Sequence, residues 1–454
     1  MKPVTFEIKD IQVFQRPVTL RLPFRFGAAT VTACPQAFAK VVLSIDGVEW
    51  QGASAELMVP KWFDKSPQRT QDDNFDQLRL CILKARDAYL TGGRAQSAYS
   101  LSESATETVI DQMLKQGHPR LVGQFGPALL DKAIADAVLR SQNQSWISGL
   151  GQGLLGDPWS GAIKLHKANS VWLRHTVGLA DRLTDAEPLT AAADGLPNSL
   201  TQAIETYGLK YFKLKVGGNL EADIERLVQI ENVLSRVQNY QVTLDGNETF
   251  QNVQTLSVFV NALTKNEATQ RLLERTLLIE QPLPRAIALE EKIPTMPFGI
   301  PVILDESDDH PDVLVKGLAL GYRGISSKAC KGIYRSLHSA SLVQQTPGCL
   351  LSGEDLTCQA GLGVQQDTLL ATSLGVQHIE RNGHHYVKGF GIAPINEASN
   401  FAKAHADLYE MNSAGVHLNV HQGQIQIESL HQVGFGHQAW PDWHSLEPIS
   451  VPNN

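Results

Sequence analysis

Paired cysteines, long apolar runs and an excess of positive charge are all missing from this 454-residue sequence. The five cysteines are odd in number and contain no Cys-x-x-Cys pair, so no zinc ribbon or thioredoxin-type motif is indicated, and a reduced, cytoplasmic setting is the simplest expectation. No stretch approaches the roughly 18 uncharged apolar residues of a membrane-spanning helix. Charges interrupt the first residues, so we expect neither a signal peptide nor a membrane partner.

Charge and composition narrow the class of protein further. Lys and Arg number 39 and Asp and Glu 47, which argues against nucleic acid as the main partner because phosphate binding needs a basic surface. A small anionic substrate needs only local positive charge. With 43% hydrophobic and 19% charged residues, the chain is neither disordered nor collagen-like. Its length suits one α/β barrel with a smaller domain as well as three modules.

The first part of the sequence has the pattern of a small α+β domain. Alternating apolar and polar residues predict strands at 6–14 and 38–45, with a loop at 22–30 (LPFRFGAAT) between them. From about residue 73 to about residue 140 apolar residues recur at i, i+3 and i+4, as in helices. We expect this first unit to span residues 1–165.

From about residue 171 short apolar runs alternate with helical patterns, about eight times in all. The expected strands are HTVGLA, YFKLKV, QVTLD, LLIE, PVILD, GISSKAC, CLLSGE and VQHIE. Such alternation predicts β-α-β crossovers and a parallel sheet, and eight units suggest a closed barrel at residues 166–394. The competing open sheet often carries a Gly-x-Gly-x-x-Gly fingerprint, which is absent after the early strands. Residues 395–454 return to alternating β patterns and should pack back on the first unit.

Two lysines share one face of the predicted barrel strand YFKLKV. Side chains alternate along a strand, so Lys213 and Lys215 point to one side and the apolar residues to the other. On the inner face of a barrel, lysines are costly unless they are paired or functional. Taken alone, however, the motif fits a solvated edge strand better.

Acidic and basic residues also stand at the ends of the later strands. Asp245 ends QVTLD, Glu280 ends LLIE just before Gln-Pro, and Asp305 ends PVILD. Each has an ordinary alternative: a hairpin turn at the Asp-Gly, a solvated strand end, and a cap of the following helix, respectively. Lys328 and Glu354 follow the next two strands, and a surface lysine and a structural cap are their alternatives.

The order of these residues favours one shared site. Consecutive strands end in Lys-x-Lys, Asp, Glu, Asp and Lys, and the C-terminal strand ends of a barrel all open on one mouth. Three carboxylates from adjacent strands suit a hard cation held by oxygen. The lysines of strands two and six would face each other across that cation. Converging polar groups of this kind predict an active site.

The ordered set resembles the enolase superfamily, in particular the muconate-lactonizing-enzyme-like subgroup of the mandelate racemase/muconate lactonizing enzyme family. The resemblance covers roughly residues 125–395 and implies a modified (β/α) TIM-type barrel with an α+β N-terminal capping domain, completed by the C-terminal segment. The matching segments are KLKVGG (213–218), TLDGNE (243–248), IEQPL (279–283), ILDES (303–307), SKACKGI (327–333) and, similar to the last capping helix, LLDKAIADAVLR (129–140).

The resemblance implies roles for individual residues. Asp245, Glu280 and Asp305 would hold Mg²⁺. Lys215 and Lys328 would form the acid/base pair, with Lys213 in support. Three further residues are weaker candidates for substrate binding: Arg25, Asn247 and Glu354. Arg25 would meet the distal end of an anionic substrate unless it is simply solvated, and Glu354 would touch substrate or orient a lysine.

Some features depart from the family pattern. The interval from Asp245 to Glu280 is long, with an apparent insertion at 265–274, and the capping domain looks enlarged. Strand seven has no histidine, so the His/Asp dyad of mandelate racemase and many acid-sugar dehydratases is missing. Strand eight ends in Glu380-Arg and lacks the Asp-x-Asp associated with dipeptide epimerases, which counts against dipeptide substrates.

The implied chemistry is removal of the proton next to a substrate carboxylate. The resulting enediolate needs a divalent metal ion as Lewis acid, and the lysine base needs a pKa lowered towards working pH. Two lysines on opposite faces allow racemisation or epimerisation, and equally cycloisomerisation or β-elimination. A non-catalytic binding or structural descendant of the barrel is the alternative of another class, which the loss of a ligand or lysine would favour; none is lost. The substrate and the oligomeric state stay open, a homo-oligomer included.

Overall fold

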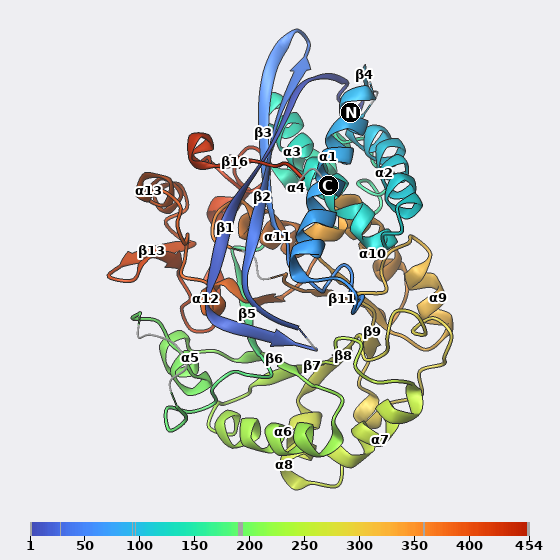
Figure 1. Ribbon diagram of the computed structural model, residues 1–454, viewed down its shortest axis with the longest axis vertical. Coiled ribbons are helices and arrows are strands. Elements are labelled where there is room, and N and C mark those ends of the chain that lie inside the picture. The colour runs from blue at the N-terminus through green and yellow to red at the C-terminus, as the bar shows by residue number, and fades with distance from the viewer. Residues whose placement is uncertain are drawn as a thin grey trace.

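The computed structural model describes residues 2–27, 29–92, 94–95, 97–188, 194–356 and 359–451 (Figure 1). Of the five cysteines, Cys358 lies outside these ranges and the other four carry free thiols. No helix in the described ranges is both long enough and apolar enough to cross a membrane.

The N-terminal unit pairs an antiparallel sheet with a layer of helices. The strands are β1 (Phe6–Phe26), β2 (Ala29–Ile45), β3 (Val48–Leu57), β4 (Arg94–Ala95) and, from the chain's other end, β16 (Glu447–Pro448). The helices are α1 (Gln71–Thr91), α2 (Ala98–Lys115), α3 (Arg120–Ser141) and α4 (Trp146–Gly151). The α+β character predicted for this region is therefore present.

The loop predicted at 22–30 was wrong, because β1 continues through Phe26 and pairs with β2 up to Ala29. Leu22, Phe24 and Phe26 are buried and the residues between them are exposed, which is the period of a strand with one covered face. The long β1–β2 ribbon in blue reaches down across the barrel in Figure 1.

The second unit is a nearly closed barrel of parallel strands, which confirms the predicted fold. In the described residues the order runs β10-β11-β12-β5-β6-β7-β8-β9, and a parallel bridge between Leu304 and Ile325 joins the two ends. The strands are β5 (Ser170–Val177), β6 (Tyr211–Lys215), β7 (Gln241–Asp245), β8 (Thr276–Glu280), β9 (Val302–Ile303), β10 (Gly324–Ser327), β11 (Leu350–Gly353) and β12 (His378–Arg381).

Helices connect these strands, as the alternating pattern predicts. They are α5 (Leu200–Tyr207), α6 (Leu220–Leu234), α7 (Val253–Leu263), α8 (Glu267–Glu274), η1 (Pro297–Gly299), α9 (Val313–Ala319), η2 (Ala329–Lys331), α10 (Ile333–Gln345), α11 (Leu362–Ser373) and α12 (Gly383–Tyr386). The hairpin alternative at Asp245 is wrong, since β7 and β8 are parallel and two helices lie between them. The apparent insertion at 265–274 is the second of these helices, α8.

The C-terminal segment contacts both units. It holds α13 (Ile395–Ala404), β13 (Tyr409–Asn412), β14 (Gly415–Leu418), β15 (Gln424–Gln426), η3 (Glu428–His431), η4 (Trp443–Ser445) and β16. A helix rather than β structure therefore begins at residue 395. β15 adds antiparallel to the barrel strand β5, whereas β16 pairs with β1 of the first unit. The segment thus adds a strand to each of the two units.

Helix α3 lies between the N-terminal sheet and the barrel and is buried without interruption from Leu121 to Leu139. Its contact with β3 is close: a Cβ on Gly52 would lie 2.0 Å from the carbonyl oxygen of Ala133. Only a residue without a side chain fits there, so β3 and α3 are fixed together directly behind the barrel mouth.

Candidate active site

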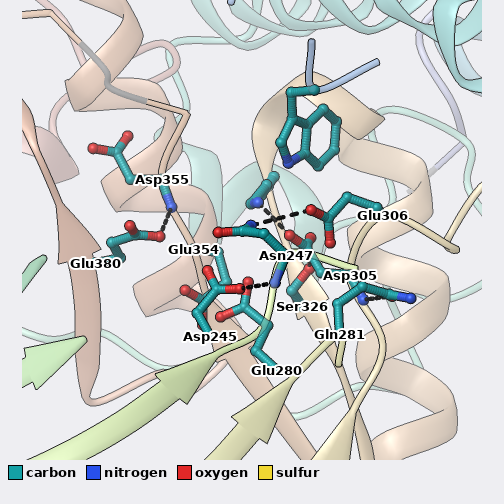
Figure 2. A network of polar contacts seen from close by, with 12 residues as sticks. Asp245, Asn247, Glu280, Gln281, Asp305, Glu306, Ser326, Glu354, Asp355 and Glu380 are labelled. Atoms are coloured by element: carbon teal, nitrogen blue, oxygen red, sulfur yellow. Dashed lines mark hydrogen bonds and ion pairs between the residues drawn. The ribbon is translucent and has the colours of Figure 1, made fainter. Parts of the chain in front are cut away.

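The predicted lysines and carboxylates meet at the C-terminal strand ends. In the parallel register Lys215 pairs with Asp245, Asp245 with Glu280, and Glu280 with Ile303 just before Asp305. Figure 2 shows the carboxyl groups of Asp245, Glu280 and Asp305 in one region beyond the strand tips. The alternatives of a solvated edge strand and solvated strand ends are wrong, because all these side chains are buried.

Lys213 is the centre of this cluster. Its Nζ lies 2.9 Å from Asp245 Oδ2, 2.7 Å from Glu280 Oε2, 2.6 Å from Glu354 Oε2 and 2.8 Å from Glu380 Oε2. Burial alone would lower the pKa of Lys213, but the four carboxylates raise it well above its usual value. The ammonium group therefore stays charged and holds four strands together at the mouth.

The two lysines proposed as acid and base come from opposite sides of the barrel. Lys215 on β6 and Lys328 at the end of β10 stand on the second and sixth of eight strands, and both line one small cavity. Lys215 Nζ is 2.5 Å from Asp245 Oδ2, and Lys328 Nζ is 2.5 Å from Asp305 Oδ2. Two ammonium groups can therefore approach one substrate from two directions.

Aromatic rings of the N-terminal unit cover these two lysines. Lys328 Nζ lies 4.5 Å from the ring centroid of Trp62, and Lys215 Nζ lies 5.9 Å from the centroids of Phe24 and Phe26. The faces of aromatic rings attract cations and exclude water. The cap thus covers both lysines with aromatic rings, while carboxylates contact them from the barrel side.

Asp305 has a lysine partner on each of its two oxygens. Besides Lys328, Lys331 Nζ lies 3.1 Å from its Oδ1, and the Ser326 hydroxyl donates to the same oxygen. Burial would raise the pKa of Asp305, but Lys328 and Lys331 lower it well below its usual range. In return Asp305 and Glu280 raise the pKa of Lys328 against the effect of burial. These carboxylates act against the lowering of a lysine pKa that a base requires.

Glu280 is the least satisfied carboxyl group at the mouth. Its Oε1 is buried and has no hydrogen-bond partner among the described residues, while its Oε2 meets Lys213. Burial, and then the charges of Asp245 and Glu354, raise its pKa well above the usual value. A buried oxygen without a partner is costly, and a bound cation would satisfy it.

The fit of Mg²⁺ to these residues is good in chemistry but incomplete in geometry. Asp245, Glu280 and Asp305 supply oxygen ligands from adjacent strands, as Mg²⁺ prefers. Within the part of the chain that the structure describes, however, no three Asp, Glu, His or Cys side chains are arranged to hold one ion. Lysine ammonium groups occupy one oxygen of Asp245, one oxygen of Glu280 and both oxygens of Asp305.

The three weaker candidates have different surroundings. Asn247 lines the small cavity, and its Nδ2 donates to Glu306 over 3.1 Å while its Oδ1 has no partner among the described residues. Glu354 contacts Lys213 and is itself held by Arg174 and Ser352. Arg25 lies between the buried Phe24 and Phe26 with an exposed side chain, so strand alternation points it away from the mouth.

Sequence reasoning missed three residues of the cluster. Glu380 is the last residue of the expected strand VQHIE and contacts Lys213. Its place at a strand end is a sequence signal that could have indicated this contact. Lys331, three residues after Lys328, contacts Asp305 and Ser326. Trp62 gave no sequence signal, because its contact with Lys328 joins segments far apart in the chain.

The mouth is almost closed by the cap. The cavity beside the lysines has a volume of about 20 Å³, which suffices for about one water molecule. An outer cavity of about 450 Å³ adjoins it, and Phe26 and Asn247 line both. Lys65 from the cap reaches Glu248 and Glu306 at the barrel end over 2.6 and 3.3 Å. A substrate therefore needs movement of the cap side chains to reach the lysines.

Comparison with known proteins places this arrangement in a fold family. No family profile and no curated protein matches the sequence. Among solved structures, a mandelate racemase/muconate lactonizing protein from Herpetosiphon aurantiacus is 18% identical, with 96% of this chain and 99% of that chain covered and a TM-score of 0.62. A dipeptide epimerase from Cytophaga hutchinsonii, complexed with Mg and the dipeptide D-Ala-L-Val, is 16% identical over 99% of each chain with a TM-score of 0.61.

A third solved structure extends the same likeness. The L-Ala-D/L-Glu epimerase from Bacillus subtilis, in a substrate-liganded complex, is 14% identical, with 95% and 98% of the two chains covered and a TM-score of 0.58. The chain thus has the fold of the mandelate racemase/muconate lactonizing enzyme family within the enolase superfamily. The resemblance inferred from the strand-end residues is confirmed at the level of the fold.

Proposed function

We propose that this protein is an enzyme that abstracts the proton next to the carboxylate of a small substrate, in a Mg²⁺-dependent reaction, and most simply racemises or epimerises that centre. The observation that carries the proposal is the placement of Lys215 and Lys328 on opposite strands of one barrel, beside the same cavity. One lysine removes the proton on one face of the substrate carbon. The other returns a proton on the opposite face, which inverts the centre.

The residues proposed to hold Mg²⁺ are Asp245, Glu280 and Asp305. When bound, the ion would act as a Lewis acid that makes negative charge on the substrate carboxylate less costly. Support comes from the all-oxygen donor set and from the buried Glu280 Oε1 that has no partner among the described residues. Binding requires that Asp245 and Asp305 release contacts with Lys215 and Lys328.

The chain's own residues supply the remaining work. Lys213 holds Glu354 and Glu380 and so fixes the strands on which substrate contacts depend. Trp62 and Phe24 exclude water from the lysines, which keeps the proton on the substrate or on the enzyme. The lysines must start each turnover in opposite protonation states, one neutral and one charged, so that the proton is conserved.

A second candidate is cycloisomerisation or β-elimination on the same scaffold. One lysine would then move the proton and the other would stabilise negative charge as an ammonium ion. The observation in its favour is an asymmetry of the pair: Lys328 Nζ lies 4.5 Å from the ring centroid of Trp62, a contact that stabilises an ammonium ion, whereas Lys215 Nζ lies 5.9 Å from those of Phe24 and Phe26.

Proton exchange distinguishes these reactions. The enzyme with Mg²⁺ is incubated in deuterated water with panels of acylated amino acids, dipeptides and hydroxy acids, and deuterium next to the carboxylate is measured by mass spectrometry. For a racemase, Lys215→Ala and Lys328→Ala should each block net conversion yet spare exchange from the enantiomer that faces the surviving lysine. For the second candidate only one of the two variants should lose exchange.

The control for both variants is Lys316→Ala. Lys316 is exposed on α9 and is not part of the cluster at the strand ends. This variant should leave exchange unchanged. A wild-type enzyme that turns over its substrate without any exchange, and keeps full activity after chelation, contradicts the proposal.

A further inference from the structure

A third cavity, separate from the two at the mouth, lies between the cap helices and the barrel. Its volume is about 440 Å³, and it is lined by one face of α2, one face of α3 and residues at the start of α10. It shares no lining residue with the two cavities at the barrel mouth. This volume accommodates a small organic molecule.

Aromatic rings form one end of this cavity. The ring centroid of Tyr99 lies 5.3 Å from that of Trp159 and 5.2 Å from that of Tyr334, both edge to face. The ring of Trp159 also lies 5.3 Å from that of His338. The faces of Trp and Tyr rings attract organic cations.

Two buried polar atoms in the wall have no partner among the described residues. They are the hydroxyl oxygen of Tyr334 and Oε1 of Gln124. Tyr334 is 7% exposed and Gln124 is 3% exposed. The other amide atom of Gln124 donates to the carbonyl oxygen of Asp309 over 2.5 Å, which leaves Oε1 as an acceptor without a donor. A ligand with N–H groups would supply that donor.

Acidic side chains lie near the rings. Burial raises the pKa of Tyr334 well above its usual value, and the nearby carboxylates of Asp131 and Asp157 raise it further. Glu103, exposed on α2, accepts from the Tyr99 hydroxyl over 3.1 Å. Glu103 therefore places a carboxylate beside the aromatic end of the cavity, whereas burial raises the pKa of Asp131 to about 7.

The cations in the wall do not offset this charge, because aspartates outside the cavity already match them. Lys331 Nζ lies 3.1 Å from Asp305 Oδ1 and 3.4 Å from Asp308 Oδ2. Arg335 Nε lies 4.0 Å from Asp308 Oδ1. The buried polar atoms of the wall that have no partner among the described residues are Gln124 Oε1 and the Tyr334 hydroxyl.

We propose that this cavity binds a small protonated organic amine with an apolar body. The ammonium group would lie against the rings of Tyr99, Trp159 and Tyr334 and donate to Gln124 Oε1 and the Tyr334 oxygen. The apolar body would occupy the space along α2 and α3. None of its lining residues is a proposed lysine base or Mg²⁺ ligand, and Lys331 is the lining residue that also contacts Asp305.

The test uses three probes that carry a phenyl ring and differ in charge: 2-phenylethylammonium, 2-phenylethanol and benzoate. Binding to the full chain is measured by isothermal titration calorimetry and ligand-observed NMR. The ammonium should bind at least about tenfold more tightly than the alcohol, and benzoate should not bind. Equal binding of the ammonium and the alcohol would overturn the proposal.

Variants then locate the bound probe. Trp159→Leu should weaken ammonium binding about tenfold, and Tyr334→Phe severalfold; the latter removes a hydroxyl that no described residue uses and so should fold normally. Glu290→Gln, a change at an exposed acid elsewhere, is the matched control. Affinity that is unchanged in Tyr334→Phe and Trp159→Leu but falls in Lys215→Ala would place the amine in the barrel mouth and refute the site.

Discussion

At the scale of single residues, one ammonium group decides how the mouth is held together. Lys213 is 1% exposed and contacts four carboxylates, so its removal would leave several buried negative charges without a partner. Breaking a buried ion pair by removing one partner typically costs about 3–5 kcal/mol. The same group that supports the proposed chemistry is thus also a structural requirement.

We therefore expect Lys213→Met to lower the free energy of unfolding by about 3–5 kcal/mol. Urea unfolding followed by circular dichroism measures this change, with Lys316→Met on the surface of α9 as the control that should change little. Mg²⁺ should restore part of the loss, because a cation can replace the missing charge. A loss below about 1 kcal/mol in the presence of a chelator would show that Lys213 does not stabilise the cluster.

At the scale of elements, the proposed metal site depends on three neighbouring strands. Asp245 ends β7, Glu280 ends β8 and Asp305 lies two residues after β9, so each strand supplies one ligand. We expect Asp245→Asn, Glu280→Gln and Asp305→Asn each to weaken Mg²⁺ binding at least about tenfold, measured by calorimetry. Chelation of the wild type should abolish proton exchange. Asp309→Asn, outside this ligand set, is the control, and equal Mg²⁺ affinity in all four variants would contradict the ligand assignment.

The contact between β3 and α3 is a second property of elements. A side chain at Gly52 would collide with backbone atoms at Ala133 and Ala137, at 2.0 and 2.6 Å. We expect Gly52→Ala to destabilise the protein by about 1–3 kcal/mol, measured by chemical unfolding, because backbone must shift to make room. Gly151→Ala at the end of α4 is the matched control, since nothing lies within 4 Å of its added carbon. Similar stability of the two variants would refute the steric argument.

At the scale of the whole molecule, Asp136 ties the C-terminal segment to the N-terminal unit. This buried carboxylate of α3 accepts from the backbone N–H of Ala53 over 3.2 Å and of Phe435 over 2.7 Å. It also lies 3.0 Å from Arg140 and 2.8 Å from His437 Nε2. Strand, helix and C-terminal segment therefore meet on one side chain.

The pKa of Asp136 predicts how stability depends on acid. Burial would raise this pKa, but His437 and Arg140 lower it from 3.8 to about 2. Because the folded-state pKa lies below the unfolded one, the contribution is present above pH 3.8 and is lost as the pH falls towards 2. We expect roughly 2–3 kcal/mol to disappear over this interval. Unfolding curves at several pH values measure it, and Asp136→Asn should flatten the slope between pH 4 and 2; an unchanged slope would contradict the assignment.

The sequence by itself determined the barrel and the convergence of Lys215, Asp245, Glu280 and Asp305. Strands that alternate with helices must run parallel, and parallel strands of a closed barrel bring their C-terminal ends to one mouth. Local periodicity and strand order therefore sufficed, and the positions of β6, β7, β8 and β9 agree with the segments expected.

Only the tertiary structure decided which group meets which at that mouth. The four-carboxylate environment of Lys213, the Trp62 ring over Lys328 and the outward direction of Arg25 depend on the register of strands and on contacts between segments far apart in the chain. The same holds for β15, whose alternating pattern was read correctly but whose partner is the barrel strand β5. A period of two shows that a segment is a strand; the edge that it joins depends on which unpaired backbone groups fold next to it.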